Sequence, residues 1–376
     1  MDASSERPYT SVMKLTLAAY LGLFASFALQ LGPSPAHADE RVRSREQLRR
    51  EGYKPVVVDK LAKDPVFPYS AHSLSWPIEF QDATHTLGNL MAQYQPFGKP
   101  YYHGGIDVRT RGGKSVHAPV AGKLEAGHYS YVTNDDGSMD KMWKAWPQQG
   151  ESTYFEVAVV TDEGFRFEFH HVNRSTLPGP IVAMLNAGGG RVTVGMELGS
   201  AIDWVGQDYD HIHYNIVTPS GVRLNPEFES TLLMDTMAPE ISDVVAVFQN
   251  GKTQAFGGGV FNEVPTEFNL AVQDHQNGNV YDHPPTIVKI QFDNGVDAGW
   301  DFHEKLLDVD GKFPPLWDFF VQRVKTPDGR RLSTSGGYGT GVSVVRLKVP
   351  PSAHGKFIIL VKDQADNTTT FHGSVP

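Results

Sequence analysis

The sequence predicts an all-β protein, because short β-forming runs alternate with turn signals over most of its length. The runs are rich in Val, Ile, Phe and Tyr and are bounded by Gly, Pro, Asn or Asp, which is typical of antiparallel sheets. A chain of 376 residues with 40% hydrophobic content is long enough for two or three domains with ordinary cores. The clearest runs are 114–127, 153–172, 188–202, 211–222, 243–251, 266–274, 286–295, 343–349 and 356–367.

Changes in composition divide the chain into four predicted segments. These are an export signal (1–38), a charged linker or short helix (39–75), a first β domain (76–235) and a second β domain (236–376). After the boundary at 234–241, about seven further strand candidates with Asn-Gly or Asp-Asn turns predict an immunoglobulin-like β-sandwich. Within the first domain, residues 129–152 carry aromatic residues without a strand pattern, so we expect a long inserted loop or a small helix.

The first 38 residues have the order of a secretory signal. Lys14 precedes the uncharged apolar run 15–31, which is followed by two prolines and by the small-residue site 36–38. Cleavage after Ala38 is therefore expected, and the alternative is an uncleaved membrane anchor, because the apolar run is slightly long for a signal. No other segment is apolar enough to span a bilayer. The sequence thus predicts an exported protein, in the periplasm or outside the cell.

Cysteine and charge content exclude several classes of function. The chain has no cysteine, so it has no disulfide, no thiolate metal site and no cysteine nucleophile. Any metal must be held by His and carboxylate side chains. The formal net charge of -10 argues against nucleic acid as the main partner.

The stretch KPYYHGGIDVRTRGG, residues 99–113, places His103 and Asp107 four residues apart. On a helix, residues at this spacing share a face, but Pro100 and the pair Gly104 and Gly105 are incompatible with a regular helix here. A glycine turn that leads into a strand must bring the two side chains together. The remaining residues of a site must come from elsewhere in the chain.

Two further histidine motifs lie on predicted strands. In residues 211–216, His211 and His213 alternate with apolar residues, so a strand would direct both imidazoles to one face. Strand alternation also separates His170 from His171: His171 is in register with two phenylalanines, and His170 is expected to point toward solvent. His171 is therefore the better candidate for a site. Each motif alone is weak evidence, and alternation does not decide which of His211 and His213 binds a metal.

The order of these motifs resembles that of the lysostaphin/LytM-type zinc endopeptidases, which cut bacterial cell-wall peptides. The resemblance covers about residues 80–230 and rests on HGGIDV, KSVHAPVAGKLEAG, FHHV, GMELGSAI and HIHYNI in this order. The sequence departs from the family pattern at Leu124, Phe169, Val172, Leu198, Ile212, Tyr214 and Asn215. None of these departures removes a metal ligand. Asn215, which replaces a glutamate, is expected to change hydrogen bonds behind the ligands.

The resemblance implies a role for each histidine of the motifs. His103, Asp107 and His213 would bind Zn²⁺, and His171 and His211 would be the catalytic pair that does not bind the metal. Two imidazoles and one carboxylate leave a fourth tetrahedral position for water, whose pKa zinc can lower to about 7. One of the catalytic histidines would then help to deprotonate water, and the other would stabilise the oxyanion or protonate the leaving amine. The sequence does not show which of His171 and His211 has which of these two roles.

Three functions are compatible with this sequence. The first is an exported zinc endopeptidase that acts on peptide bonds of peptidoglycan cross-links. The second is a LytM-like regulator or wall-binding protein without activity, and the third is a zinc endopeptidase that acts on proteins other than the wall. The second β domain is expected to hold the enzyme near its substrate, to bind a protein partner or to cover the groove.

Other conspicuous residues have simpler explanations. His117 and His128 flank a predicted strand and are expected at the surface or as hydrogen-bonded core residues. The aromatic residues Tyr101, Tyr102, Trp143 and Trp146 either line a substrate groove or belong to a core. The motif at 362–368, which contains Asp363, is expected to be a turn because it lacks the ligand series of an EF-type calcium loop, and the alternative is a calcium-binding role.

Overall fold

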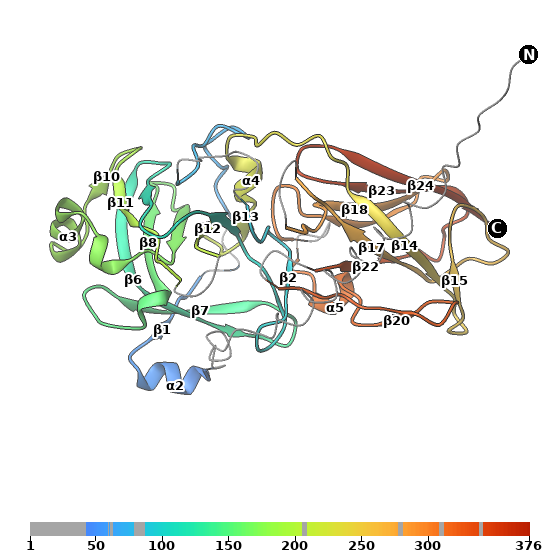
Figure 1. The fold of residues 1–376 in the computed structure, drawn as a ribbon, viewed down its shortest axis with the longest axis horizontal. Coiled ribbons are helices and arrows are strands. Elements are labelled where there is room, and N and C mark those ends of the chain that lie inside the picture. Colours follow the sequence, from blue (N-terminus) through green and yellow to red (C-terminus); the bar gives the residue numbers. More distant parts are fainter. Residues whose placement is uncertain are drawn as a thin grey trace, which may run out of the picture. The chain divides into compact units, whose positions relative to one another are not determined.

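The computed structural model describes residues 43–58, 60, 63–78, 87–204, 209–276, 281–307, 312–337 and 341–376 (Figure 1). They belong to one compact unit, Arg43–Pro376. Strands dominate its regular structure, which confirms the predicted all-β class. In the described part of the chain, no helix is long and apolar enough to cross a membrane. The predicted export signal and the cleavage position after Ala38 lie outside the described residues.

A nine-stranded antiparallel sheet forms the centre of the first β-rich part (Figure 1). Seven strands follow one path, namely β1 (Lys54–Pro55), β7 (Met139–Ala145), β6 (Gly122–Thr133), β8 (Phe155–Val160), β9 (Arg166–His170), β12 (His211–Val217) and β13 (Arg223–Leu224). Two strands pair beside this path, β10 (Arg191–Val192) with β6 and β4 (Ile106–Arg109) with β12. A separate two-stranded sheet joins β5 (Ser115–His117) to β11 (Glu197–Ser200).

Strand alternation gives this sheet one apolar and one polar face. The apolar face packs into a hydrophobic core, to which the central strands contribute Ile106, Val108, Phe155, Val157, Val159, Phe167, Phe169, Ile212, Tyr214 and Ile216. Apart from Ala158, the residues between them are charged or polar and point to the opposite face, which we call the site face. Asp107, Glu156, Glu168, His170, His211, His213 and Asn215 all lie on it by this alternation.

The prediction of an inserted loop or small helix at 129–152 is wrong. Most of this segment forms a β-hairpin, in which the end of β6 pairs with β7 from Gly127 opposite Ala145 to Thr133 opposite Met139. Its turn is closed by a hydrogen bond from the amide of Asn134 to the carbonyl of Ser138 (2.8 Å). The sequence NDDG at the turn is a hairpin signal, but the mixed polar and aromatic residues on both strands hide the period of two.

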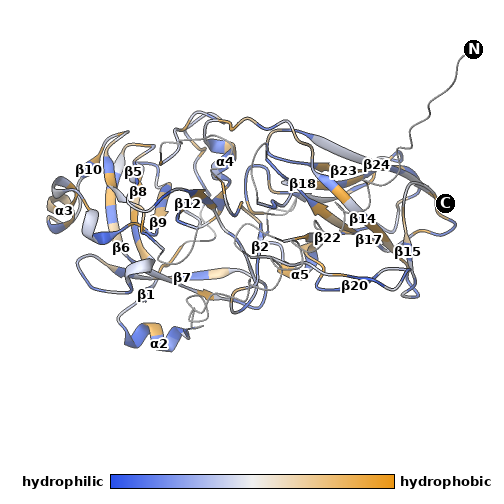
Figure 2. Ribbon diagram, in the orientation of Figure 1, coloured by the Kyte–Doolittle hydropathy of each residue, from blue (hydrophilic) through white to orange (hydrophobic). Residues whose placement is uncertain are grey.

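Helices are short, and several begin with a side-chain cap. The predicted charged helix of the linker is present as α2 (Arg45–Arg50), where Ser44 accepts a hydrogen bond from the amide of Gln47. Its only buried residue, Leu48, packs in a small cluster with Tyr53 and Met142, and the rest of α2 is hydrophilic in Figure 2. The other helices of the described residues are α3 (Gly179–Asn186), α4 (Pro226–Glu229), α5 (Leu316–Phe319) and the 3₁₀ turns η1 (Ser152–Tyr154) and η2 (Arg174–Thr176).

The second β-rich part is a sandwich of two sheets with a shared core. One sheet has the order β15 (Thr253–Ala255), β14 (Glu240–Val247), β17 (Glu267–Gln273) and β22 (Ser343–Lys348). The other has the order β16 (Gly259–Val260), β24 (Thr368–Val375), β23 (Gly355–Lys362), β18 (Ile287–Phe292) and β19 (Asp297–Asp301). Residues such as Phe268, Leu270, Ile290 and Ile359, from both sheets, fill the space between them. Between β19 and β22 in the chain, β20 (Val324–Lys325) and β21 (Arg331–Leu332) form a small separate sheet.

A short hairpin from the first part packs in the core of the sandwich. It consists of β2 (Tyr94–Gln95) and β3 (Tyr101–Tyr102). The ring of Tyr102 is fully buried, 5.6 Å from that of Phe320, so Tyr102 is a core residue and does not line a groove. Since His103 follows Tyr102 directly, the sandwich core holds the chain at the edge of the candidate site.

Candidate metal centre

Three antiparallel strands place the predicted residues side by side on the site face. In the register of β4 and β12, His213 lies opposite Asp107, and on the other side of β12 it lies opposite His170 of β9. His211 follows the same face of β12, because it is two residues from His213. The sheet therefore brings together residues that are far apart in the sequence.

His103, Asp107 and His213 form a compact group whose possible ligand atoms all lie within 4.8 Å of one another. The Oδ1 atom of Asp107 is 3.1 Å from Nε2 of His103 and 3.0 Å from Nδ1 of His213. Two atoms that both bind a tetrahedral zinc ion at about 2.0 to 2.1 Å are about 3.3 Å apart. The distances and the donor types, two imidazoles and one carboxylate, therefore fit a zinc ion.

Hydrogen bonds behind the ligands fix their orientation. The carbonyl of Leu90 accepts a hydrogen bond from Nδ1 of His103 (3.0 Å), which leaves Nε2 of this ring with the lone pair that faces Asp107. The second carboxylate oxygen of Asp107, Oδ2, accepts hydrogen bonds from the side-chain amide of Asn89 (2.9 Å) and the hydroxyl of Tyr209 (3.2 Å). These two donors hold the carboxylate of Asp107 in one position.

The charges of the site are shifted by burial and by neighbours. Burial alone would raise the pKa of Asp107, but its close contacts with the His103, His211 and His213 rings hold this pKa well below its ordinary value. Burial lowers the pKa of His213 to about 3. At neutral pH the group thus contains a carboxylate and a neutral imidazole, which are the forms that bind a metal.

His171 and His211 lie next to this group with their rings 4.8 Å apart. Nδ1 of His171 donates to the carbonyl of Thr153 (2.7 Å), and Nδ1 of His211 donates to the carbonyl of Tyr209 (2.7 Å). Each Nε2 therefore carries the lone pair, and that of His211 is 3.7 Å from Oδ1 of Asp107. Burial lowers the pKa of both rings, so both are neutral proton acceptors at pH 7.

A left-handed backbone residue brings His171 to the site. The strand β9 ends at His170, and His171 has a φ angle of 63°. This conformation is uncommon for a residue with a Cβ atom and is typical of functional positions. It explains why His171, whose register along β9 would direct it to the phenylalanine core, lies instead beside His211.

The prediction that His170 points toward solvent is wrong. His170 is only 1% exposed, and its ring stacks on that of His213 at 5.0 Å. Its Nε2 is 2.9 Å from a carboxylate oxygen of Glu156 and 3.3 Å from one of Glu168. His170 does lie on the opposite face of β9 from the phenylalanines, as alternation predicts. This face is the site face, and it is buried because the hairpin of β6 and β7 covers it, with the ring of Tyr129 4.0 Å from that of His170.

Basic side chains neutralise this buried glutamate pair. Lys141 of β7 lies 2.5 Å from an oxygen of both Glu156 and Glu168. Arg166 contacts the same two carboxylates at 2.7 and 2.9 Å. Asn215 also contacts this pair, because its side-chain amide donates a hydrogen bond to Glu168 (3.1 Å). The hydrogen bonds that Asn215 was expected to change are therefore those of the buried glutamates.

Several residues that orient the site had little sequence signal. Asn89 and Tyr129 belong to no motif, and Tyr129 places its hydroxyl 3.4 Å from Nε2 of His171. Tyr209 has the same parity as His211 and His213, and extending the strand argument by two residues would have found it. His128, expected at the surface or in a core, is buried and hydrogen-bonded to the carbonyl of Glu151 (2.9 Å).

Of the comparisons with known proteins, the one with solved structures found matches, and these are distant. No protein-family model matches the sequence, and no curated protein matches it. Among solved structures, a Pseudomonas aeruginosa protein described as an M23 peptidase aligns with 18% identity and a TM-score of 0.27, over 54% of this chain and 64% of that one, less than two thirds of its length. Lysostaphin aligns with 10% identity and a TM-score of 0.23, over 75% of this chain and 91% of its own. Similarity at this level does not assign the chain to a family.

Proposed function

We propose that this protein is an exported zinc endopeptidase that hydrolyses peptide bonds in peptidoglycan cross-links. The observation that carries the proposal is the meeting of His103, Asp107 and His213 within 4.8 Å, with His171 and His211 directly beside them. Two neutral imidazoles and a carboxylate are the donor set of a catalytic zinc rather than of a closed structural site. The N-terminal segment supports export, and the order of the motifs supports a wall substrate.

The protein's own residues would divide the work as follows. His103, Asp107 and His213 would hold the ion, with their orientation fixed by the carbonyl of Leu90 and by Tyr209. Zinc, when bound, would polarise the scissile carbonyl and lower the pKa of water. His171 and His211 would each present an unprotonated Nε2 to the reacting groups.

A neutral imidazole is suited to moving one proton in two steps. One ring accepts a proton from the attacking water as the C–O bond forms. The resulting imidazolium stabilises negative charge on the tetrahedral intermediate and then donates a proton to the leaving amine as the C–N bond breaks. The ring stacking of Trp204 on His211 (5.8 Å, 5° between planes) keeps this ring in place during the exchange.

The test combines metal analysis with wall digestion. The purified protein is analysed for zinc by mass spectrometry and incubated with purified sacculi, and the released muropeptides are identified by mass. We expect about one zinc per chain and products cut at a peptide cross-link. Wall cleavage that survives complete removal of zinc, or that survives the change Asp107→Ala, would contradict the proposal.

Two other outcomes would point to the remaining functions. Zinc without any cleavage of wall or protein substrates favours a regulator or wall-binding protein. Cleavage of proteins but not of sacculi favours an endopeptidase with a substrate outside the wall. His372→Ala is the control variant, because His372 is an exposed histidine of the sandwich.

A further inference from the structure

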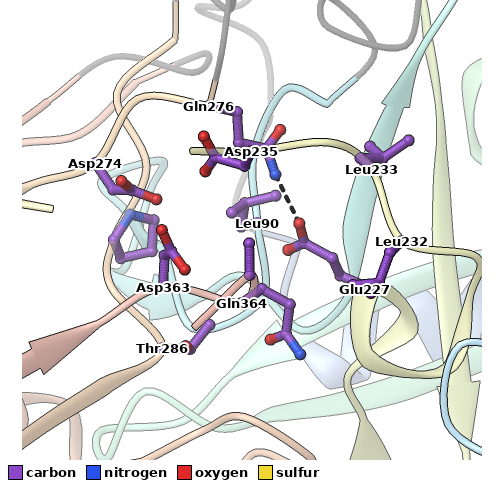
Figure 3. A pocket seen from close by; sticks show the side chains of 12 residues that line it. Leu90, Glu227, Leu232, Leu233, Asp235, Asp274, Gln276, Thr286, Asp363 and Gln364 are labelled. Carbon is purple, nitrogen blue, oxygen red and sulfur yellow. Dashed lines mark hydrogen bonds between the residues drawn. The ribbon is translucent and has the colours of Figure 1, made fainter. Parts of the chain in front are cut away.

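A second cluster of charged residues lies where the first β-rich part meets the sandwich. It comprises Glu227 of α4, Asp235 between α4 and β14, Asp274 directly after β17 and Asp363 directly after β23. We call these four residues the acidic cluster. Carboxylate oxygens of Asp235, Asp274 and Asp363 all lie within 4.8 Å of one another. Figure 3 shows the labelled side chains around one shared space.

One carboxylate oxygen in this cluster is buried and unpaired. Asp274 is 2% exposed, and its Oδ1 atom has no hydrogen-bond partner among the described residues. The two nearby aspartates surround it with carboxylate oxygens, which in their ionised form also only accept hydrogen bonds. A buried acceptor without a donor is uncommon in a folded protein, and a bound ion or water is one way to satisfy it.

The neighbours of Asp274 do not neutralise it. Asn367 donates to both oxygens of Asp363 (2.9 and 2.8 Å), and Gln276 donates to Glu227 (2.6 Å), the bond drawn in Figure 3. In the described ranges, no lysine or arginine forms an ion pair with Glu227, Asp274 or Asp363. The buried pair Glu156 and Glu168, by contrast, has Lys141 and Arg166.

The electrostatics agree with a missing positive charge. Burial, reinforced by Asp363 and the other acids, raises the pKa of Asp274 to about 8, although the backbone amide of His275 acts in the opposite direction. Burial and the charge of Asp363 also raise the pKa of Glu227 to about 8. A bound cation would reverse both effects, because it favours the ionised carboxylates.

We propose that Asp235, Asp274 and Asp363 form a calcium-binding site, a function beyond the proposed hydrolysis. The candidate ligands are oxygens, without histidine or cysteine, and hard oxygen ligands select Ca²⁺ or Mg²⁺ over zinc. Oxygens on opposite sides of one Ca²⁺ are about 4.6 to 5.2 Å apart, since each lies 2.3 to 2.6 Å from the ion. Three carboxylate oxygens within 4.8 Å of one another can therefore reach a single Ca²⁺.

The surroundings fit calcium better than magnesium. The cavity between the side chains has a volume of about 10 Å³, enough for one water molecule or one small ion. It is also lined by Gln276, whose amide oxygen is a further calcium-type ligand. Magnesium requires a strict octahedron with several waters, and three aspartates from separate segments provide no such regularity.

Calcium at this position would connect three segments of the chain. Asp235 lies in the connection that leads into the sandwich, and the other two aspartates follow β17 and β23, strands of its two different sheets. Leu90 also lines the cavity, and its carbonyl accepts the hydrogen bond from His103. The ion would therefore hold the connection to the sandwich close to a residue that orients the candidate zinc site.

The test measures calcium binding on the full purified chain, whether or not it carries zinc. After removal of calcium with a selective chelator, CaCl₂ is titrated by calorimetry, and the melting temperature is recorded with and without calcium. We expect about one Ca²⁺ per chain with a Kd below about 1 mM, the weak limit of extracellular calcium sites. At a hundredfold excess over Kd, the melting temperature should rise by roughly 5 °C.

Substitutions distinguish calcium binding at this site from binding to other acidic residues, which are numerous in a chain with a net charge of -10. Asp274→Asn and Asp363→Asn should weaken calcium binding at least about tenfold and abolish the thermal shift. Asp297→Asn, at an exposed position of β19, is the matched control and should bind as the unaltered chain does. Because an amide removes repulsion, Asp274→Asn should melt no lower than the unaltered protein in chelator.

Two results would overturn the proposal. The first is the absence of calcium binding to the unaltered protein, which would mean that Asp274 is simply protonated. The second is calcium binding that Asp274→Asn and Asp363→Asn leave unchanged. Neither result bears on wall hydrolysis, so this proposal and the proposed function fail independently.

Discussion

Asp107 and Asp274 are both almost fully buried, at 3% and 2% exposure, yet their carboxyl groups behave in opposite ways. Histidines surround Asp107, and its pKa lies well below the ordinary value. Other acids surround Asp274, and its pKa is raised to about 8. Burial disfavours the charged form of both residues, so the neighbours decide the direction of the shift.

The two clusters also differ in how they are built. The histidine site lies on adjacent strands of one sheet, where hydrogen-bonded register fixes the relative position of Asp107, His211 and His213. The acidic cluster gathers residues from a helix, a connection and two strand ends. A site on a rigid sheet can hold ligand geometry without the ion, whereas a site made of chain ends depends more on the ion itself.

The largest expected effect in this comparison is that of Asp107→Asn. The amide keeps the shape of the side chain but removes the charge between His103 and His213, so zinc binding should be lost. Hydrolysis of sacculi should fall by at least about a thousandfold, or about 4 kcal/mol of activation free energy. Zinc content and initial rates measure this change, and calcium binding is the control that should stay constant.

His171→Ala should separate catalysis from metal binding. The ring lies beside His211 and not among the three close ligand atoms, so the variant should keep its zinc. Loss of a proton-transfer group should slow hydrolysis by roughly a hundred- to a thousandfold. Full activity, or loss of zinc in this variant, would show that His171 has a different role.

Lys141→Met tests whether a buried acidic pair needs its cation. The change leaves Glu156 and Glu168 with less compensation, because Lys141 contacts both of them at 2.5 Å. The free energy of unfolding should fall by about 3 kcal/mol, as when one partner of a buried ion pair is removed. Denaturant unfolding measures it, and Lys123→Met on the exposed part of β6 should change stability far less.

Tyr209→Phe removes a single donor from Asp107. Only the hydroxyl that lies 3.2 Å from Oδ2 is lost, and the hydrogen bond from Asn89 remains. Zinc affinity should fall about tenfold, the lower end for residues that orient metal ligands. Competition with a zinc chelator of known affinity measures it, and an unchanged affinity would mean that Asn89 alone positions Asp107.

The smallest effect is expected for Asp274→Asn in the absence of calcium. Replacing this carboxylate removes repulsion with Asp363 and Asp235, so the melting temperature should stay equal or rise by about 1 to 3 °C. Asp107→Asn should not show such a rise, because its carboxylate accepts hydrogen bonds from Asn89 and Tyr209. A scan of both variants in chelator compares the two aspartates directly; a large fall for Asp274→Asn would contradict the contrast.

Alternation predicted the face that His211 and His213 share, whereas the full set of candidate ligands was implied only by the family resemblance. The period of two in 211–216 places His211 and His213 on one face, and the structure shows Ile212, Tyr214 and Ile216 in the core. It was not sufficient for His170, because a polar face of a strand can be covered by another part of the chain. The hairpin that covers it, formed by β6 and β7, was itself hidden by its irregular polar pattern.

By itself, the sequence determined the all-β class, the faces of the strands and the residue types available for a metal, because these follow from side-chain period and composition. Only the tertiary structure showed the contacts between distant residues. The acidic cluster shows this most clearly, since Asp235, Asp274 and Asp363 share no motif and no period. Their proximity results from long-range packing, which local sequence does not encode, and the same holds for the positive φ angle that directs His171 to the site.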